Sequence, residues 1–193
     1  MTTISFSPET LLMPAARPST LTRSLGLALA FSLLIALSAQ FKIPLPFTPV
    51  PATGQTFAVL LCGALLGARW GTIAVGLYLL EGFAGLPVFA GGHNYTQLSA
   101  TIGYLPAFMI GAAVTGWFCE RGWDKSTVRA LSAMTFGLFV IYAGGWFGLT
   151  YFMPASAAFA QGVVPFVVGD IFKIVLAAAA LPLGWKLTRP EPI

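Results

Sequence analysis

The last apolar stretch of the chain reads Gly162-Val-Val-Pro-Phe-Val-Val-Gly-Asp170-Ile-Phe-Lys173-Ile-Val-Leu-Ala-Ala-Ala-Ala-Leu-Pro-Leu-Gly-Trp185. It is long enough to cross a bilayer, because about 20 apolar residues span the hydrocarbon core. Its only two charges are Asp170 and Lys173, and each charge costs about 2.5–3.5 kcal/mol at mid-bilayer. At a spacing of i, i+3 they share one helical face and can offset each other. The stretch therefore predicts a membrane helix that contains a charge pair.

The composition of the whole chain is that of a membrane protein. Of its 193 residues, 57% are hydrophobic and 8% are charged, whereas soluble domains carry about 25% charged residues. Long apolar runs predict helices, and the alternating pattern of a membrane barrel is absent. The net charge of +4 comes from scattered Lys and Arg residues. These predict orientation in the membrane and no nucleic-acid partner.

Six transmembrane helices are predicted within a membrane domain at residues 23–187, after a flexible leader at residues 1–22. Their predicted bounds are 23–40, 55–68, 70–85, 101–119, 129–152 and 162–185. The first segment also fits a signal peptide, since Arg17 and Arg23 precede an apolar core that ends in Ser38-Ala39-Gln40. The Pro-rich residues 41–54 predict a stiff, extended loop folded back onto the bundle.

The positive-inside rule orients this bundle. With the N-terminus in the cytoplasm, eight of the ten Lys and Arg residues fall inside, namely Arg17, Arg23, Arg69, Arg121, Lys125, Arg129, Lys186 and Arg189. Lys42 falls outside, and the C-terminus is cytoplasmic. The loops at 41–54, 86–100 and 153–161 then face outward. Asp170 lies about 12 Å below the outer end of its helix, at about 1.5 Å per residue, within reach of a solute.

Asp170 and Lys173 are the strongest candidates for a ligand site, because charges inside membranes usually mark function. The alternative is a structural ion pair that ties helices together. A carboxylate accepts N–H bonds, and an ammonium group donates to a carbonyl or a carboxylate. Gln55 follows the Pro-rich loop and either caps a helix or touches the ligand.

Further candidates lie on the outer side. The backbone N–H groups of Gly91 and Gly92 either approach a solute or belong to an ordinary turn. Glu81 either reaches the membrane interface or faces a pocket. Trp146 forms an aromatic stripe with Tyr142, four residues earlier, and either stacks on a ligand or packs in the core or the outer aromatic belt.

Small residues four apart mark the first segment. Ala28, Ser32 and Ala36 allow another helix to approach closely, either within the bundle or from a partner membrane protein. The sequence contains no nucleotide-binding G-x-x-x-x-G-K-[ST], no H-E-x-x-H and no G-x-S-x-G motif. We therefore expect no enzymatic activity, no metal and no covalently bound cofactor, and favour a solute binder or transporter.

Two motifs are the most specific, namely Gly85-Leu-Pro-Val-Phe89-Ala-Gly-Gly92 and Pro165-Phe-x-x-Gly-Asp170-x-x-Lys173, and Pro49-Val-Pro51-x-x-x-Gln55-Thr56 precedes them. Together they resemble the BioY family, the biotin-binding S components of energy-coupling-factor (ECF) transporters. The resemblance runs from about residue 24 to 185. It fails at Ala100-Thr-Ile-Gly103, where the family usually has Pro-Thr-Gly-Gly.

This resemblance implies a multi-pass protein with the S-component fold in a prokaryotic inner membrane. It implies high-affinity capture of biotin at the outer face, together with a transmembrane coupling subunit and two ATPases as partners. A homo-oligomer is also compatible with it. An S component for another small vitamin-like solute is the alternative, followed by a non-transport membrane subunit or an intramembrane enzyme.

The resemblance also assigns residue roles. Asp170 and Lys173 match the family's polar pair, and Gln55 matches a pocket residue behind the first loop, which serves as a lid. The face of Ala28, Ser32 and Ala36 is similar to the surface that docks on the coupling subunit. The carboxylate of biotin needs donors nearer the mouth, for which the candidates are Tyr104, Asn94 and the backbone of Gly91 and Gly92.

Overall fold

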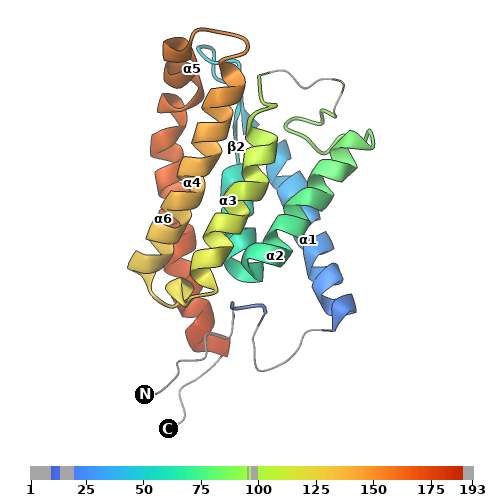
Figure 1. The fold of residues 1–193 in the computed structure, drawn as a ribbon, viewed down its shortest axis with the longest axis vertical. Helices are drawn as coiled ribbons and strands as arrows, with labels where there is room; N and C mark the ends of the chain where they lie inside the picture. Colours follow the sequence, from blue (N-terminus) through green and yellow to red (C-terminus); the bar gives the residue numbers. More distant parts are fainter. Residues whose placement is uncertain (1–9, 14–19, 95, 97–99, 189–193) are drawn as a thin grey trace.

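A computed structural model describes residues 10–13, 20–94, 96 and 100–188, and shows a helical bundle with a small β-hairpin at one end (Figure 1). The elements in chain order are α1 (Leu21–Gln40), β1 (Lys42–Ile43), β2 (Ala52–Thr53), α2 (Gln55–Phe83), α3 (Tyr104–Cys119), the 3-10 helix η2 (Trp123–Lys125), α4 (Thr127–Leu149), α5 (Ala155–Gly162) and α6 (Val164–Thr188). α1 begins and α6 ends at the same end of the bundle, while β2 and α5 lie at the other (Figure 1).

Four helical stretches of the described chain are long and apolar enough to cross a membrane. They are Leu21–Gln40, Gln55–Phe83, Thr127–Leu149 and Ala155–Leu187, and Tyr104–Cys119 is apolar but shorter. The predicted class, a helical membrane protein, is therefore confirmed. The predicted number of crossings and the cytoplasmic side of the termini stay predictions.

α2 consists of two arms joined by a sharp bend at Gly67. The backbone there has φ 82° and ψ 177°, a region that only glycine populates readily. The arms touch next to the bend, since a Cβ on Gly71 would be 2.9 Å from the Cα of Gly63. The Ala68 N–H donates to the Glu120 carboxylate across 2.8 Å, which ties the bend to the end of α3. The two predicted segments 55–68 and 70–85 thus correspond to the two arms (Figure 1).

Small residues bring α2, α3 and α4 close together. A Cβ on Gly63 would be 2.3 Å from the Ala112 carbonyl oxygen, and a Cβ on Gly116 would be 2.3 Å from the Gly67 carbonyl carbon. Such contacts are typical of membrane helices, which gain stability from close backbone packing where no water drives them together.

The Pro-rich stretch 41–54 returns to the bundle as predicted. β1 and β2 pair antiparallel, with Lys42 opposite Thr53 and Ile43 opposite Ala52. At the tip of this hairpin, the Thr48 hydroxyl donates to the Gln161 carbonyl across 2.7 Å. The hairpin therefore covers the end of the bundle where α5 lies.

Two predictions about irregular segments are wrong. Residues 153–161, expected to be a loop, contain α5, because the alanine-rich Ala-Ser-Ala-Ala-Phe-Ala has high helix propensity. The leader, expected to be flexible at 1–22, is packed at residues 10–13. Thr10 is 1% exposed, and its hydroxyl donates to the Leu65 carbonyl across 2.7 Å. Residues 1–9 and 14–19 lie outside the described residues.

The structure also corrects the predicted docking face on α1. Ala28 and Ser32 are fully buried and Ala36 is 8% exposed, because these small side chains let α1 pack on α2. The Ser32 hydroxyl donates to Oε1 of Glu81 on α2. The face is therefore covered within the chain, and Glu81 serves this helix contact.

Candidate functional site

A cavity lies between β2, α2, α3, α4 and α6 near the hairpin end of the bundle; we call it the inner cavity. Its polar lining residues are Thr53, Gln55, Thr56, Thr101, Tyr142, Asp170 and Lys173, and its main apolar and aromatic ones are Val50, Pro51, Phe89, Tyr104, Leu105, Phe108 and Phe166. The space between these side chains is about 590 Å³, including its opening.

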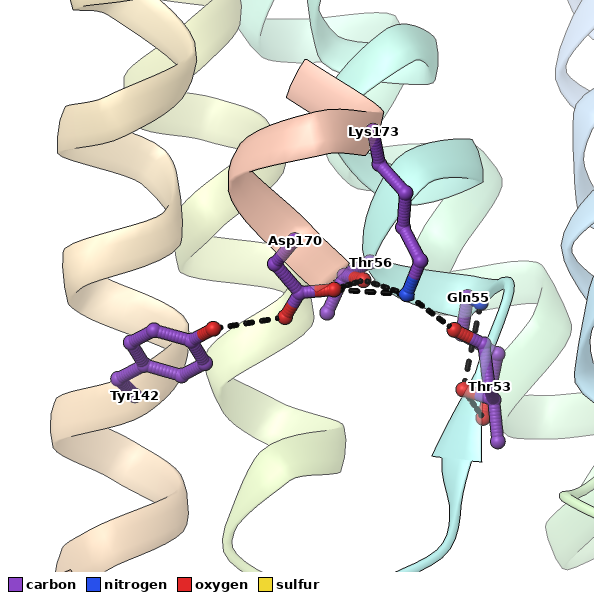
Figure 2. A network of polar contacts seen from close by, with 6 residues as sticks. All are labelled: Thr53, Gln55, Thr56, Tyr142, Asp170 and Lys173. Carbon is purple, nitrogen blue, oxygen red and sulfur yellow. Dashed lines mark hydrogen bonds and ion pairs between the residues drawn. The ribbon is translucent and has the colours of Figure 1, made fainter. Parts of the chain in front are cut away.

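Asp170 is the centre of the polar side of this cavity (Figure 2). It is 3% exposed, and its Oδ1 accepts from Lys173 Nζ at 2.7 Å and from the Thr56 hydroxyl at 2.8 Å. Its Oδ2 accepts from the Tyr142 hydroxyl at 2.8 Å. Because α2, α4 and α6 all contribute, the carboxylate is held in one orientation and its burial is compensated.

Lys173 is the half-buried partner of this carboxylate, one turn further along α6. Besides Asp170, its Nζ donates to the Thr53 carbonyl oxygen across 2.7 Å, and it approaches the Thr56 hydroxyl at the longer distance of 3.5 Å. Figure 2 shows the ammonium group between Asp170 and the end of β2. The pair therefore also fixes the hairpin strand to α6.

Asp170 and Lys173 can still form hydrogen bonds to a ligand in addition to these contacts. A carboxylate has about four lone-pair sites and an ammonium group three donors. Asp170 accepts three bonds, and Lys173 makes two short ones. Among the described residues, one acceptor site on Asp170 is left, and the third donor of Lys173 makes only the long 3.5 Å contact with the Thr56 hydroxyl, which a ligand acceptor can replace. An adjacent donor and acceptor suit a ligand that presents an N–H beside a C=O, as an amide or a urea does.

Gln55 is a cavity residue and does not cap α2. Its Nε2 donates to the Tyr78 hydroxyl across 2.6 Å, and its Oε1 accepts from the Thr53 hydroxyl at 3.2 Å. The N-cap position is Gly54, without a side-chain cap bond. Of the two predicted alternatives, helix capping is wrong, and contact of Gln55 with a ligand stays a prediction.

Tyr104 lines the inner cavity with its ring, while its hydroxyl is used elsewhere. The hydroxyl donates to the Gly162 carbonyl oxygen between α5 and α6. The ring packs directly against the backbone of α4 at Gly145, where a Cβ would be 2.1 Å from a ring carbon. Tyr104 is therefore an aromatic wall, and the predicted donation of its hydroxyl to a carboxylate has no support here.

The predicted loop donors lie outside the lining of the inner cavity and hold the loop together. The Gly91 N–H donates to the Ala39 carbonyl at 3.3 Å, and the Gly92 N–H donates to the Phe89 carbonyl at 3.0 Å. The Asn94 amide donates to the Gly85 carbonyl at 3.2 Å. These bonds shape the loop that presents Phe89 to the cavity.

Trp146 also lies outside the lining of the inner cavity. Its ring is 38% exposed, and its Nε1 donates to the Ala155 carbonyl across 3.0 Å, which joins α4 to α5. The residue of that aromatic stripe that reaches the cavity is Tyr142, one turn earlier. Sequence reasoning missed Tyr142 and Thr56 as site residues, although Thr56 directly follows Gln55 in the quoted motif.

The arrangement combines aromatic walls with one polar corner, which suits binding. The described residues contain no group of three or more His, Cys, Asp or Glu side chains that could hold a metal ion. Cys62 and Cys119, both buried, are not among the residues that line the inner cavity. The site can therefore hold an apolar ring system with one hydrogen-bonding edge.

Comparison with known proteins identifies the family. The profile of the BioY family matches residues 9–190. A Rhizobium etli protein named biotin transporter BioY is 39% identical over 183 residues, covering 86% of this chain and 96% of that protein. A Thermotoga maritima protein of the same name is 41% identical over 151 residues, covering 77% and 87%.

A solved structure shows the same fold. It is the crystal structure of the S-component for biotin from an ECF-type ABC transporter, with a TM-score of 0.78 and 25% identity, covering 86% of this chain and 92% of that one. The family match, the two relatives and this fold agree with one another. The chain therefore belongs to the BioY family.

Proposed function

We propose that this chain is the high-affinity biotin-binding S component of a biotin uptake transporter. The observation that carries the proposal is the Asp170–Lys173 pair beside aromatic walls, with one acceptor site of Asp170 open and one donor of Lys173 in only a long contact. The names of the Rhizobium etli and Thermotoga maritima relatives support it. So does the fold shared with the S-component for biotin.

The chemistry of biotin fits the two sides of the inner cavity. Its ureido ring has two N–H donors and one carbonyl, so Asp170 accepts an N–H and Lys173 donates to the carbonyl. Thr56 and Tyr142 hold the carboxylate for this contact. The fused thioether ring lies against the aromatic walls formed by Phe89, Tyr104, Phe108 and Phe166.

The proposal includes the setting of the protein. It crosses a prokaryotic inner membrane six times, with both termini in the cytoplasm, and captures biotin from the outer face. The sequence has no nucleotide-binding motif, so energy comes from two ATPases that act through a transmembrane coupling subunit. The chain itself carries out no enzymatic reaction and has no covalently bound cofactor.

Equilibrium binding of labelled biotin to the purified protein tests the proposal. We expect a dissociation constant below about 1 μM, which corresponds to about −8.2 kcal/mol. Asp170→Asn should weaken it at least tenfold, because the ureido N–H loses a charged acceptor. An affinity no better than micromolar, or unchanged affinity in Asp170→Asn, contradicts the proposal. Displacement of a bound ligand by another small vitamin and not by biotin would favour the alternative S component.

A further inference from the structure

A second cavity adjoins the first and is lined mainly by residues of the hairpin; we call it the outer cavity. It shares Pro51, Phe89, Ala90 and Thr101 with the inner cavity. Because the two share these walls, a ligand seated on Asp170 and Lys173 can extend into the outer cavity. Any chain attached to its ring would pass the apolar surfaces of Pro51, Phe89 and Ala90.

The outer cavity is lined by a second cationic side chain, distinct from Lys173 of the inner cavity. Lys42, in β1, lines it together with His93. The Lys42 side chain is exposed and lies across Gly91, where a Cβ would be 2.1 Å from its Nζ. Within the described part of the chain, no Asp or Glu forms an ion pair with Lys42. Its ammonium group is therefore available to an anion.

Thr53 of β2 lies between the ammonium groups of Lys42 and Lys173. Lys42 pairs with Thr53 across the hairpin, which sets their Cα atoms about 4.5–5.5 Å apart. The Thr53 carbonyl accepts from Lys173 Nζ at 2.7 Å. One ammonium group thus lines the inner cavity and the other the outer cavity, with a single strand between them. This arrangement matches a ligand that has a polar ring edge at one end and an anion at the other.

We propose that Lys42 is the counter-ion for the carboxylate of the bound vitamin, and that it selects free monocarboxylates over neutral esters and amides. The inference rests on the proposed function, since it concerns the far end of the same ligand. It replaces Tyr104, Asn94, Gly91 and Gly92 as carboxylate donors, because their N–H and O–H groups are engaged within the protein. His93 offers an imidazole at the same cavity.

Binding of biotin and biotin methyl ester to matched variants tests this assignment. Wild type should bind biotin more tightly than the ester. Lys42→Met should weaken biotin binding about tenfold, the effect of losing one charge-assisted hydrogen bond, and leave ester binding unchanged. Lys42→Arg should retain most of the preference for biotin. The control is Lys186→Met, which removes an equally exposed ammonium group near the end of α6 and should change neither affinity.

The unchanged affinity for the ester shows that Lys42→Met is folded, so a general loss of structure is distinguished from a lost counter-ion. Equal weakening of acid and ester in Lys42→Met overturns the inference, and so does unchanged binding of both. In either case tight biotin binding by the wild type leaves the proposed function standing. A wild-type protein that binds neither ligand overturns the proposed function and this inference with it.

Discussion

At the scale of single residues, the site depends on how one buried carboxylate is held. Asp170 accepts bonds from Thr56, Tyr142 and Lys173, which come from three helices. The charges were visible in the sequence because charged residues are rare in apolar stretches. Tyr142 and Thr56 were not, since hydroxyl-bearing residues are common in membrane helices and only the packing of α4 and α2 on α6 brings them to the carboxylate.

Tyr142→Phe should weaken biotin binding about tenfold without unfolding the protein. It removes the donor to Asp170 Oδ2, and a hydrogen bond to a charged group contributes about 1.5–3 kcal/mol. The carboxylate then turns more freely and loses its fixed direction toward the ligand. Isothermal calorimetry measures the change. Tyr151→Phe, on an exposed ring beyond the end of α4, is the matched control and should bind as wild type; equal affinities in all three proteins would contradict this role for Tyr142.

At the scale of elements, the bend of α2 shows what local sequence can predict. Gly67 and Arg69 lie between two apolar runs, and that break was enough to predict two segments. The structure adds a cause, since Gly67 adopts a backbone conformation reserved for glycine and Glu120 binds the next N–H. α5 was missed because a short helix between two spans resembles a loop when only hydrophobicity is considered.

Gly67→Ala should lower the free energy of unfolding by about 1–3 kcal/mol, the usual cost of a non-glycine residue in this backbone region. The new Cβ would also lie 2.4 Å from Glu120 Oε1 and push away the side chain that holds the bend. Thermal unfolding in detergent gives the change in melting temperature. Gly26→Ala is the control, because it lies in α1 with nothing within 4 Å of the new Cβ. A Gly67→Ala protein as stable as this control would show that the bend tolerates a side chain.

At the scale of the whole molecule, the bundle and the site rest on different contacts. Glycine and alanine packing among α2, α3 and α4 holds the bundle, whereas the polar corner lies at the hairpin end. Sequence reasoning predicted the helical membrane class and the charge pair. For Ala28, Ser32 and Ala36 the spacing left packing within the bundle and docking on a partner both open, and the resemblance favoured docking. Spacing alone does not say which helix covers a small-residue face; here α2 does.

Because the bundle and the site depend on different contacts, removing both charges of the site should abolish ligand binding without unfolding the protein. Asp170→Leu with Lys173→Leu should fold, with an unchanged or higher melting temperature in the absence of ligand, because replacing a buried ion pair by apolar residues is often neutral or stabilising. Wild type at a biotin concentration 100 times its dissociation constant should gain about 2.7 kcal/mol of stability. The double variant should gain none, because the edge that we propose for the ureido ring is gone.

The single variant Asp170→Leu completes this comparison, because it leaves the Lys173 ammonium group without its carboxylate. Breaking a buried pair by removing one partner costs about 3–5 kcal/mol, and the partial exposure of Lys173 places this variant towards the lower end of that range. Its melting temperature should therefore lie below that of the double variant. The reverse order, or a double variant that fails to fold while the single one folds, would mean that the pair holds the hairpin and α6 together and that ligand binding is secondary to this structural role.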